Sequence, residues 1–237
     1  MTLAPGVPSF PPLLTGEETR PGQDPFAKAV ARAAVGADPG LVVWADDPAT
    51  ARAAMVLAPE VSLAEAAGGA VALMLGLGDA LGALAPPEVG VQIEWPATIR
   101  VNGARCGRIR AAASTADPAA EPDWMVVGFE LDLIPPPDAV PGADPDRTWA
   151  HEEGCGEIAA RALVESWSRH SLVWINTWTD RGFRPLHESW RGRLWRLGEA
   201  LPEGGTFLGL DEAGGQLVKS GGGTVLRPLH SHLMEAS

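Results

Sequence analysis

Apolar residues recur at helical spacing in two long stretches of the chain. Residues 62–84 begin with Ser62 and Glu65, the pattern of a capping box, and continue as an apolar segment that ends before two prolines. Both this segment and residues 152–179 predict helices that bury one face. Shorter helices are predicted over residues 24–35 and 185–201. The second long stretch carries large side chains spaced by 4, 7 and 4 positions, which we interpret as core rather than as a stacking platform: Leu163, Trp167, Trp174 and Trp178.

Short apolar runs between these helices predict strands. Residues 41–45 and 55–58 are typical of buried strands, and residues 124–134 (WMVVGFELDLI) alternate like a central strand. In residues 89–109, Asn102-Gly103 predicts a tight two-residue turn, because this pair suits positive φ angles. The order of elements predicts an α+β fold in which a mostly antiparallel sheet packs against helices.

The composition of the chain changes after residue 203, where glycine becomes frequent and the apolar runs become short. Residues 204–229 (GGTFLGLDEAGGQLVKSGGGTVLRPL) predict three short strands joined by glycine-rich turns. Such a unit is too small to be stable alone and needs a larger neighbour to pack against. We therefore predict a large domain over residues 1–200 and a small, barrel-like β-domain over residues 201–237.

Composition restricts the partners. The chain has 237 residues, of which 46% are hydrophobic, and a formal net charge of −12. This acidity argues against a nucleic-acid partner, because binding phosphates requires clustered Lys and Arg. Its two cysteines form no disulfide framework, and the proline-rich start lacks the features of a secretion signal. The most apolar run, residues 66–77, is about half of the roughly 20 residues that cross a bilayer. These features predict a cytoplasmic protein without a membrane partner.

Residues 89–109 (VGVQIEWPATIRVNGARCGRI) resemble the central hairpin of the biotin and lipoate protein ligases. In that family the segment reads Lys-Trp-Pro-Asn-Asp, then a few strand residues, an Asn-Gly-like turn, and a Lys shortly before a Gly. Glu94 occupies the place of the first lysine, and Arg105 that of the second, which grips the acyl-adenylate. The matching positions are Trp95, Pro96, Asn102, Gly103 and Gly107.

The resemblance extends to a phosphate loop at residues 45–54 (ADDPATARAA). Arg52 keeps the first arginine of the family's loop, but alanines replace both glycines and the second arginine. Those glycines let the backbone approach the adenylate, so their loss and the shortening of the loop argue against ATP-dependent adenylation. The alternative is that residues 46–48 form an ordinary turn before a helix-like start and that Arg52 is a surface residue.

Further candidate ligand contacts lie on the predicted strands. Arg105 could hold a carboxylate or a phosphate through two hydrogen bonds, and would form an anion pocket with Arg108 or Arg110 if they converge. Strict alternation along a strand, however, sends Arg108 and Arg110 to the face opposite Arg105, and the alternative is that these arginines form a solvated strand edge. Trp95 and Pro96 are either the wall of an acyl or adenine pocket or a core residue and a strand stop. Gly128 matches a glycine of the family's central strand and permits close approach of a ligand or of a packed neighbour.

Cys155 is the candidate nucleophile. Octanoyl and lipoyl transferases of the same superfamily carry the acyl group on a cysteine in a Cys-Gly context after the central strand. We expect Cys155 near a helix N-terminus, with His151 on the same face as a base. The alternative is a buried free cysteine, since the adjacent glutamates disfavour a thiolate and no lysine lies nearby. No metal site is predicted, because His151 and Cys155 lack further ligands at known spacing.

The resemblance implies a biotin/lipoate ligase fold with a small SH3-like β-barrel at its C-terminus, and two classes of function remain open. In the first, the protein transfers an acyl or biotinyl group to a lysine of an acceptor domain, with Arg52 and Arg105 on the carboxylate or phosphate. A variant of it uses Cys155 without ATP. In the second, the protein is a pseudoenzyme that binds a small carboxylate or a protein without turnover. Biotin, lipoate and octanoate are the candidate ligands, ATP is doubtful, and the relatives imply a homodimer.

Overall fold

A computed structural model of the chain describes residues 7–140 and 142–234. Seven strands form one sheet in the order β1-β2-β3-β7-β6-β5-β4, in which only the β1–β2 pair is parallel. The predicted α+β fold with a mostly antiparallel sheet is therefore confirmed. The strands are β1 (Thr15–Glu18), β2 (Leu41–Trp44), β3 (Thr50–Leu57), β4 (Val91–Glu94), β5 (Thr98–Val101), β6 (Ala104–Ala113) and β7 (Met125–Asp132).

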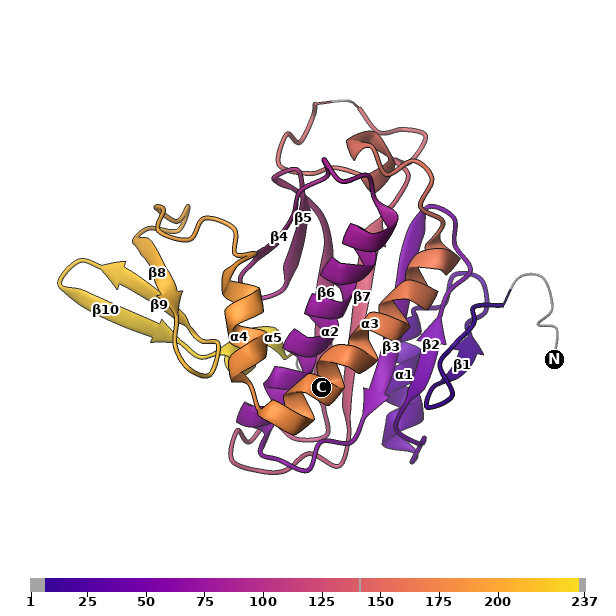
Figure 1. The fold of residues 1–237 in the computed structure, drawn as a ribbon, viewed down its shortest axis with the longest axis horizontal. Helices are drawn as coiled ribbons and strands as arrows, with labels where there is room; N and C mark the ends of the chain where they lie inside the picture. The colour runs from indigo at the N-terminus through magenta and orange to yellow at the C-terminus, as the bar shows by residue number, and fades with distance from the viewer. Residues whose placement is uncertain (1–6, 141, 235–237) are drawn as a thin grey trace.

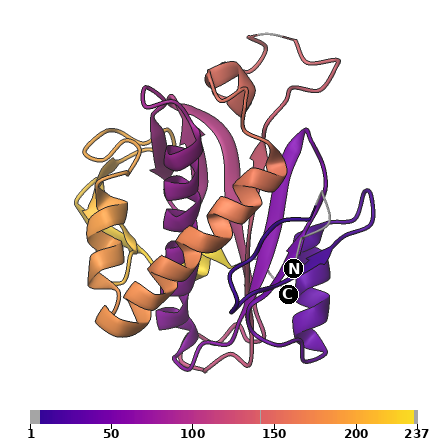
Figure 2. The same ribbon diagram turned by 45° about the vertical axis from the view of Figure 1, so that its right-hand side comes forward.

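Helices cover both faces of this sheet unequally. The two longest, α2 and α3, cross on one face, and α1 lies on the other (Figure 1; Figure 2). The larger core lies between the sheet and α2 and α3, and the smaller one lies under α1. On the face that carries α1, the part of the sheet that this helix does not cover has polar side chains from β3, β6 and β7. The helices are α1 (Pro25–Ala34), α2 (Leu63–Leu84), α3 (Ala160–Arg181), α4 (Arg184–Arg191) and α5 (Leu229–Leu233), with a 3-10 helix, η1 (Ala150–Glu153).

The capping box at the start of α2 is present. The hydroxyl of Ser62 donates to the Glu65 carboxylate at 2.8 Å and accepts from the Glu65 N–H at 3.5 Å. Although α2 is long and apolar enough to cross a membrane, 78% of its most apolar window is buried inside the protein. It is the central core helix of this fold.

Replacing Ser62 with alanine should lower the free energy of unfolding by about 1 kcal/mol, because the first turn of α2 loses its side-chain acceptor. Urea denaturation at pH 7 measures the change. Ser220→Ala is the control, because Ser220 is exposed on the strand Gln216–Ser220 and its hydroxyl forms no hydrogen bond among the described residues. Equal stability of the Ser62→Ala variant and the wild type would contradict this role of the box.

The Asn102-Gly103 turn joins β5 to β6 as predicted, with φ angles of 49° and 92°. Beyond the turn, Arg100 pairs with Arg105 and Ile99 pairs with Gly107, so Cys106 is an extra residue in β6. This β-bulge reverses the alternation of side chains on its two sides.

One local prediction near the sheet differs from the structure, and one strand was not predicted. Residues 50–54, interpreted as part of a phosphate loop, belong to β3 and pair with β7. Only residues 45–49 lie between β2 and β3. Alanines without glycine favour continuous strand pairing here, so the chain turns once and returns directly into the sheet. The short polar strand β1 gave no apolar signal and was not predicted.

Both predicted C-terminal helices are shorter than expected. The first starts at Ala160 rather than near residue 152, because Gly154 ends η1 with a φ of 91°. The second ends at Arg191, ahead of Gly192, rather than near residue 201. Leu163 and Trp167 are fully buried, as their spacing predicts, whereas Trp174 and Trp178 are only partly buried at the edge of the core.

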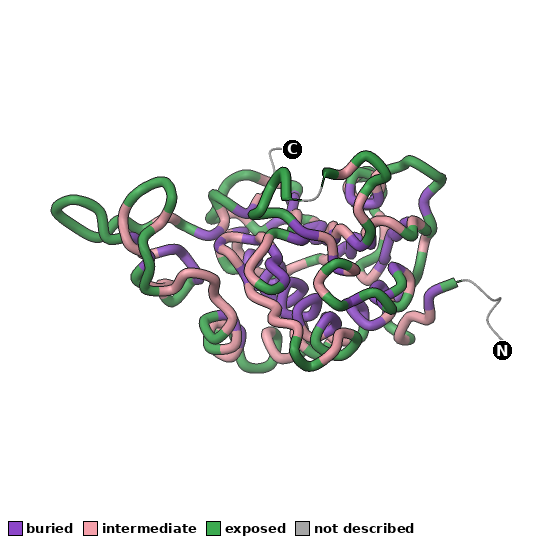
Figure 3. The backbone as a smooth tube through the Cα atoms, turned by 90° about the horizontal axis from the view of Figure 1, so that it is seen from above, coloured by how far each residue is buried: buried purple, intermediate pink, exposed green. Residues whose placement is uncertain are grey.

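The C-terminal segment forms a three-stranded sheet in the order β10-β9-β8, composed of β8 (Thr206–Leu210), β9 (Gln216–Ser220) and β10 (Gly223–Arg227). In the described residues it is an open sheet that projects from the molecule, with β10 largely exposed, and the predicted SH3-like barrel is not confirmed (Figure 3). Three strands are too few to close. The division into residues 1–200 and 201–237 stays a prediction, because α5 packs back against α2. Residues 1–6 of the leader and 235–237 lie outside the described residues.

Candidate functional site

Polar side chains gather on the sheet face that also carries α1. Arg52 on β3 and Arg108 on β6 both pair in register with Glu130 on β7, so the three form one row across the sheet. In the next row, Ala54 and Arg110 flank Gly128. The site is therefore built from three neighbouring strands.

The arginines of these rows already have carboxylate partners. Arg108 donates to Glu130 from Nε and Nη2 at 3.0 and 2.9 Å, and Arg52 pairs with Asp47 at 3.0 Å. The Nε of Arg52 is buried and has no partner among the described residues. A ligand oxygen on this face would satisfy that N–H group.

The sheet face next to α1 is filled by the protein itself. Arg110 pairs with Asp24 at 2.7 Å and lies over the ring of Phe26, 4.1 Å from its centroid. The hydrogen bond from Arg110 helps to lower the pKa of Asp24, against the opposing effect of burial. A Cβ at Gly128 would lie 3.0 Å from Phe26 and 2.9 Å from the Ala53 carbonyl. Gly128 therefore serves the packing of α1, and only about 10 Å³ of free cavity remains there.

A larger cavity of about 480 Å³ lies further along β6 and β7. We call it the arginine cavity, because Arg105, Arg108 and Arg147 all line it. Strict alternation would place Arg105 and Arg108 on opposite faces of the strand. The bulge at Cys106 brings both to the same cavity. The prediction that they face apart is therefore wrong. The other lining residues are Thr98, Cys106, Gly107, Glu130, Asp132 and Asp144.

Backbone hydrogen bonds bring Arg147 to this cavity. The N–H of Arg105 donates to the Asp146 carbonyl and the N–H of Thr148 donates to the Arg105 carbonyl, both at 2.8 Å. Arg147 then pairs with Asp132 at 2.8 Å, a hydrogen bond that raises the pKa of the guanidinium. Sequence reasoning missed Arg147, whose neighbourhood is irregular. Glu130 and Asp132 could have been identified from the sequence, because they stand two positions apart on one predicted strand and so share one of its faces.

Gly107 is required by the closeness of β7. A Cβ at this position would lie 2.4 Å from the Glu130 carbonyl oxygen. Gly107 also lines the arginine cavity.

Arg100 is a buried residue that holds the loop beside the site, and sequence reasoning did not identify it. Its side chain is 4% exposed and bonds to Asp146 at 2.6 Å and to Glu94 at 2.8 Å. Burial alone would lower the pKa of Arg100, but these hydrogen bonds raise it above its usual value. The same contact lowers the pKa of Asp146. Asn102 and Gly103 form the adjacent turn and do not line the arginine cavity. The Asn102 side-chain oxygen accepts a hydrogen bond from the Gly90 N–H at 2.9 Å.

Trp95 and Pro96 lie away from the arginine cavity. The indole N–H of Trp95 donates to the Gly214 carbonyl at 3.0 Å, and its ring lies 5.0 Å from that of His232. Trp95 is 9% exposed and lies in the larger core. With Pro96 it lines a separate cavity of about 180 Å³ facing the C-terminal sheet.

Cys155 lies in a setting different from the one expected. It precedes α3 by a loop instead of sitting at the helix start, and it is 1% exposed. Burial raises the pKa of its thiol, and Glu153 raises it further. His151 lies 3.0 Å from the Ile158 carbonyl through Nε2. Burial likewise raises the pKa of Cys106 to about 12. Within residues 7–140 and 142–234, no cluster of His, Cys, Asp and Glu could hold a metal ion.

The structure thus brings Arg105 and Gly107 together with Arg108 and Arg147, and places Arg52 and Gly128 on the same sheet face. Trp95 and Pro96 line a different cavity, and Cys155 does not line the arginine cavity, although it lies close enough to Cys106 to help raise the pKa of that thiol. A carboxylate-sized anion fits the first group chemically, whereas the spacing offers no combined acyl, nucleotide and thiol site.

Known proteins share this architecture. A solved biotin protein ligase-like protein of unknown function from Silicibacter sp. tm1040 is 49% identical, with a TM-score of 0.90 over 97% of this chain and 100% of that one. The biotin protein ligase from Aquifex aeolicus has a TM-score of 0.70 over 90% of this chain and 92% of its own, at 16% identity, a likeness of fold alone.

Sequence comparison agrees with the fold. A biotin--[acetyl-CoA-carboxylase] ligase from Paracoccus denitrificans is 27% identical over 184 residues, which cover 73% of this chain and 75% of the relative. The model of the Biotin/lipoate A/B protein ligase family matches residues 10–192, well over half of the chain. The chain therefore belongs to the biotin/lipoate A/B protein ligase family.

Proposed function

We propose that the protein binds a small carboxylate in the arginine cavity and does not activate it with ATP. The observation that supports this most directly is the convergence of Arg105, Arg108 and Arg147 on one cavity of about 480 Å³. Its volume is in the range of small-molecule sites, about 300–1,000 Å³. Guanidinium groups bind carboxylates through paired hydrogen bonds.

The existing ion pairs in the cavity are weak enough to be exchanged. The side chains of Arg105, Arg108 and Arg147 are 49%, 60% and 52% exposed. Exposed ion pairs contribute about 0–1 kcal/mol, so a ligand carboxylate can replace a protein carboxylate at small cost. The unpartnered Nε of Arg52 offers a further donor on the same sheet face.

Several features weigh against nucleotide activation. The connection over residues 45–49 is too short to cover a triphosphate, and Arg52 lies within β3. The only lysines are Lys28, paired with Glu17 at 3.0 Å, and Lys219 on β9. The carboxylates of Glu130, Asp132 and Asp144 balance the charge of the three lining arginines, so the cavity suits a singly charged carboxylate better than a triphosphate with several negative charges.

Acyl transfer through Cys155 has less support. The thiol is buried, its pKa is raised, and its neighbour His151 contacts a carbonyl instead. A thiolate is the reactive form, so this environment disfavours a nucleophile. Binding without turnover, with biotin as the first ligand to test and lipoate and octanoate next, is the function that the geometry favours.

Calorimetric titration with biotin, lipoate and octanoate, each with and without ATP, tests the proposal. We expect one of the three to bind with an affinity that ATP does not change, and no acyl-adenylate in the mass spectrum. The Arg105→Gln/Arg108→Gln variant should bind about tenfold more weakly, since two charged hydrogen-bond donors are lost.

Arg184→Gln is the control, because Arg184 is 88% exposed on α4 and does not line the arginine cavity. A retained adenylate would overturn the claim that the protein does not activate its ligand. Failure of all three carboxylates to bind, or equal binding by the double variant, would overturn the assignment of the cavity.

A further inference from the structure

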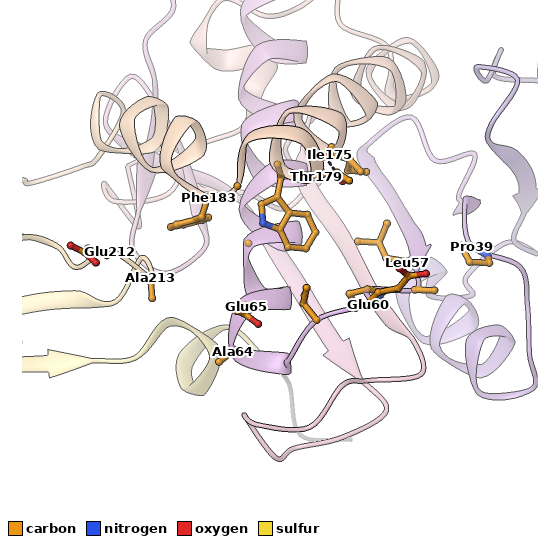
Figure 4. A pocket seen from close by; sticks show the side chains of 16 residues that line it. Pro39, Leu57, Glu60, Ala64, Glu65, Ile175, Thr179, Phe183, Glu212 and Ala213 are labelled. Carbon is orange, nitrogen blue, oxygen red and sulfur yellow. Dashed lines mark hydrogen bonds between the residues drawn. The ribbon is translucent and has the colours of Figure 1, made fainter.

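A second cavity, of about 790 Å³, lies on the helix-covered side of the molecule. It is bordered by the end of β3, the start of α2, the end of α3 and the turn between β8 and β9. Figure 4 shows Glu212 and Ala213 on one side of it and Leu57, Glu60 and Pro39 on the other. It shares no lining residue with the arginine cavity.

The wall of this helix-side cavity is apolar and aromatic. Leu57, Val61, Ile175, Trp178 and Phe183 supply most of the surface. A Cβ at Gly68 would lie 2.8 Å from Nε1 of Trp178 and 3.2 Å from Phe183. The absent side chain therefore allows both rings to stand against α2, where they present a continuous surface to a ligand.

The charged lining residues are all acidic. Glu60, Glu65 and Glu212 line the cavity, and no Lys, Arg or His does. Glu60 and Glu212 form no ion pair within the described parts of the chain, whereas Glu65 is held by Ser62. These carboxylates are exposed, and at the mouth of the cavity they favour a cation over an anion.

The helix ends that border the cavity also disfavour an anion. The N–H groups at the start of α2 are already bonded: Leu63 to the Ala120 carbonyl, Ala64 to the Pro118 carbonyl and Glu65 to Ser62. The end of α3 contributes Thr179 and Gly182 to the lining. A helix C-terminus carries partial negative charge, which adds to that of the carboxylates.

We propose that the helix-side cavity binds an organic cation with an apolar body, such as an arylalkylammonium. The ammonium group pairs with one of the two carboxylates, Glu60 or Glu212, which stand on opposite sides of the cavity, and the apolar body lies against Trp178 and Phe183. Aromatic faces attract cations as well as apolar groups, so charge and wall chemistry select the same ligand class. The proposal does not depend on the function of the arginine cavity.

Calorimetric titration of the full chain with 4-phenylbutylamine tests this proposal, with 5-phenylpentanoate as the anionic counterpart of similar size. We expect the amine to bind at one site and the carboxylate not to bind there. The Glu60→Gln/Glu212→Gln variant should bind the amine about three- to tenfold more weakly, and added salt should reduce the difference. The Ala64→Phe variant, which fills the cavity, should abolish amine binding.

The matched control is Glu88→Gln/Glu199→Gln, since both residues are exposed and lie outside the cavity. It removes the same charge and should leave amine binding unchanged. Equal weakening by both double variants would show that net charge alone attracts the amine and would overturn the site. Failure of the amine to bind, or binding by the Ala64→Phe variant, would overturn it as well. Thermal unfolding of each variant shows that the fold is retained.

Discussion

The Trp167→Ala variant is expected to lose about 3 to 5 kcal/mol of unfolding free energy, the range for removing a large buried aromatic side chain. Trp167 is fully buried on α3. Its indole N–H donates to the Leu73 carbonyl of α2 at 3.1 Å, and its ring meets Phe129 of β7 edge-on, with centroids 4.9 Å apart. One side chain therefore joins both long helices to the central strand.

Guanidinium denaturation followed by circular dichroism measures this loss. Trp167→Phe should lose less, because it keeps most of the apolar contact and removes only the hydrogen bond and part of the ring volume. Val173→Ala on the same helix is the control, since Val173 is 63% exposed and should change stability by less than about 0.5 kcal/mol. A Trp167→Ala variant as stable as the Val173→Ala control would show that the two layers are held together elsewhere.

The Arg100→Met variant is expected to lose about 2 to 3 kcal/mol at pH 7, because charged hydrogen bonds to Asp146 and Glu94 disappear while the apolar stem is retained. Arg100 also donates to the Gly103 carbonyl at 2.7 Å and lies 5.0 Å from the Trp195 ring. Arg100 therefore holds the loop that contains Arg147 against the strands β4 and β5. Loosening it should also weaken ligand binding in the arginine cavity. Arg184→Met, at an exposed position, should leave both properties unchanged.

The loss caused by Arg100→Met should depend on pH. Because Arg100 lowers the pKa of Asp146 in the folded protein, this carboxylate stabilises the fold above its unfolded pKa of about 4. That contribution disappears as the pH falls through the lower, folded pKa. The stability difference between wild type and variant should therefore be largest above about pH 5 and shrink in acid. A difference that stays constant from neutral to acidic pH would assign the effect to packing alone.

Local patterns sufficed for much of the fold. The Ser62-Glu65 box, the Asn102-Gly103 turn and the alternation of residues 124–134 each depend on neighbours close in the sequence, and each led to the right element. Predictions failed where a glycine or a missing glycine decided the boundary. Gly154 delayed α3, and the alanines of residues 51–54 continued β3 instead of forming a loop.

By itself, the sequence determined the class of the fold, the family and the loss of lysines and loop glycines, because these follow from residue type and short-range spacing. Only the tertiary structure decided which candidate residues meet. The bulge at Cys106 turned Arg105 and Arg108 toward one cavity, and the loop pairing brought in Arg147. Trp95 instead faced Gly214, far along the chain. Strand register and long-range packing set these contacts, and both depend on residues that no local pattern relates.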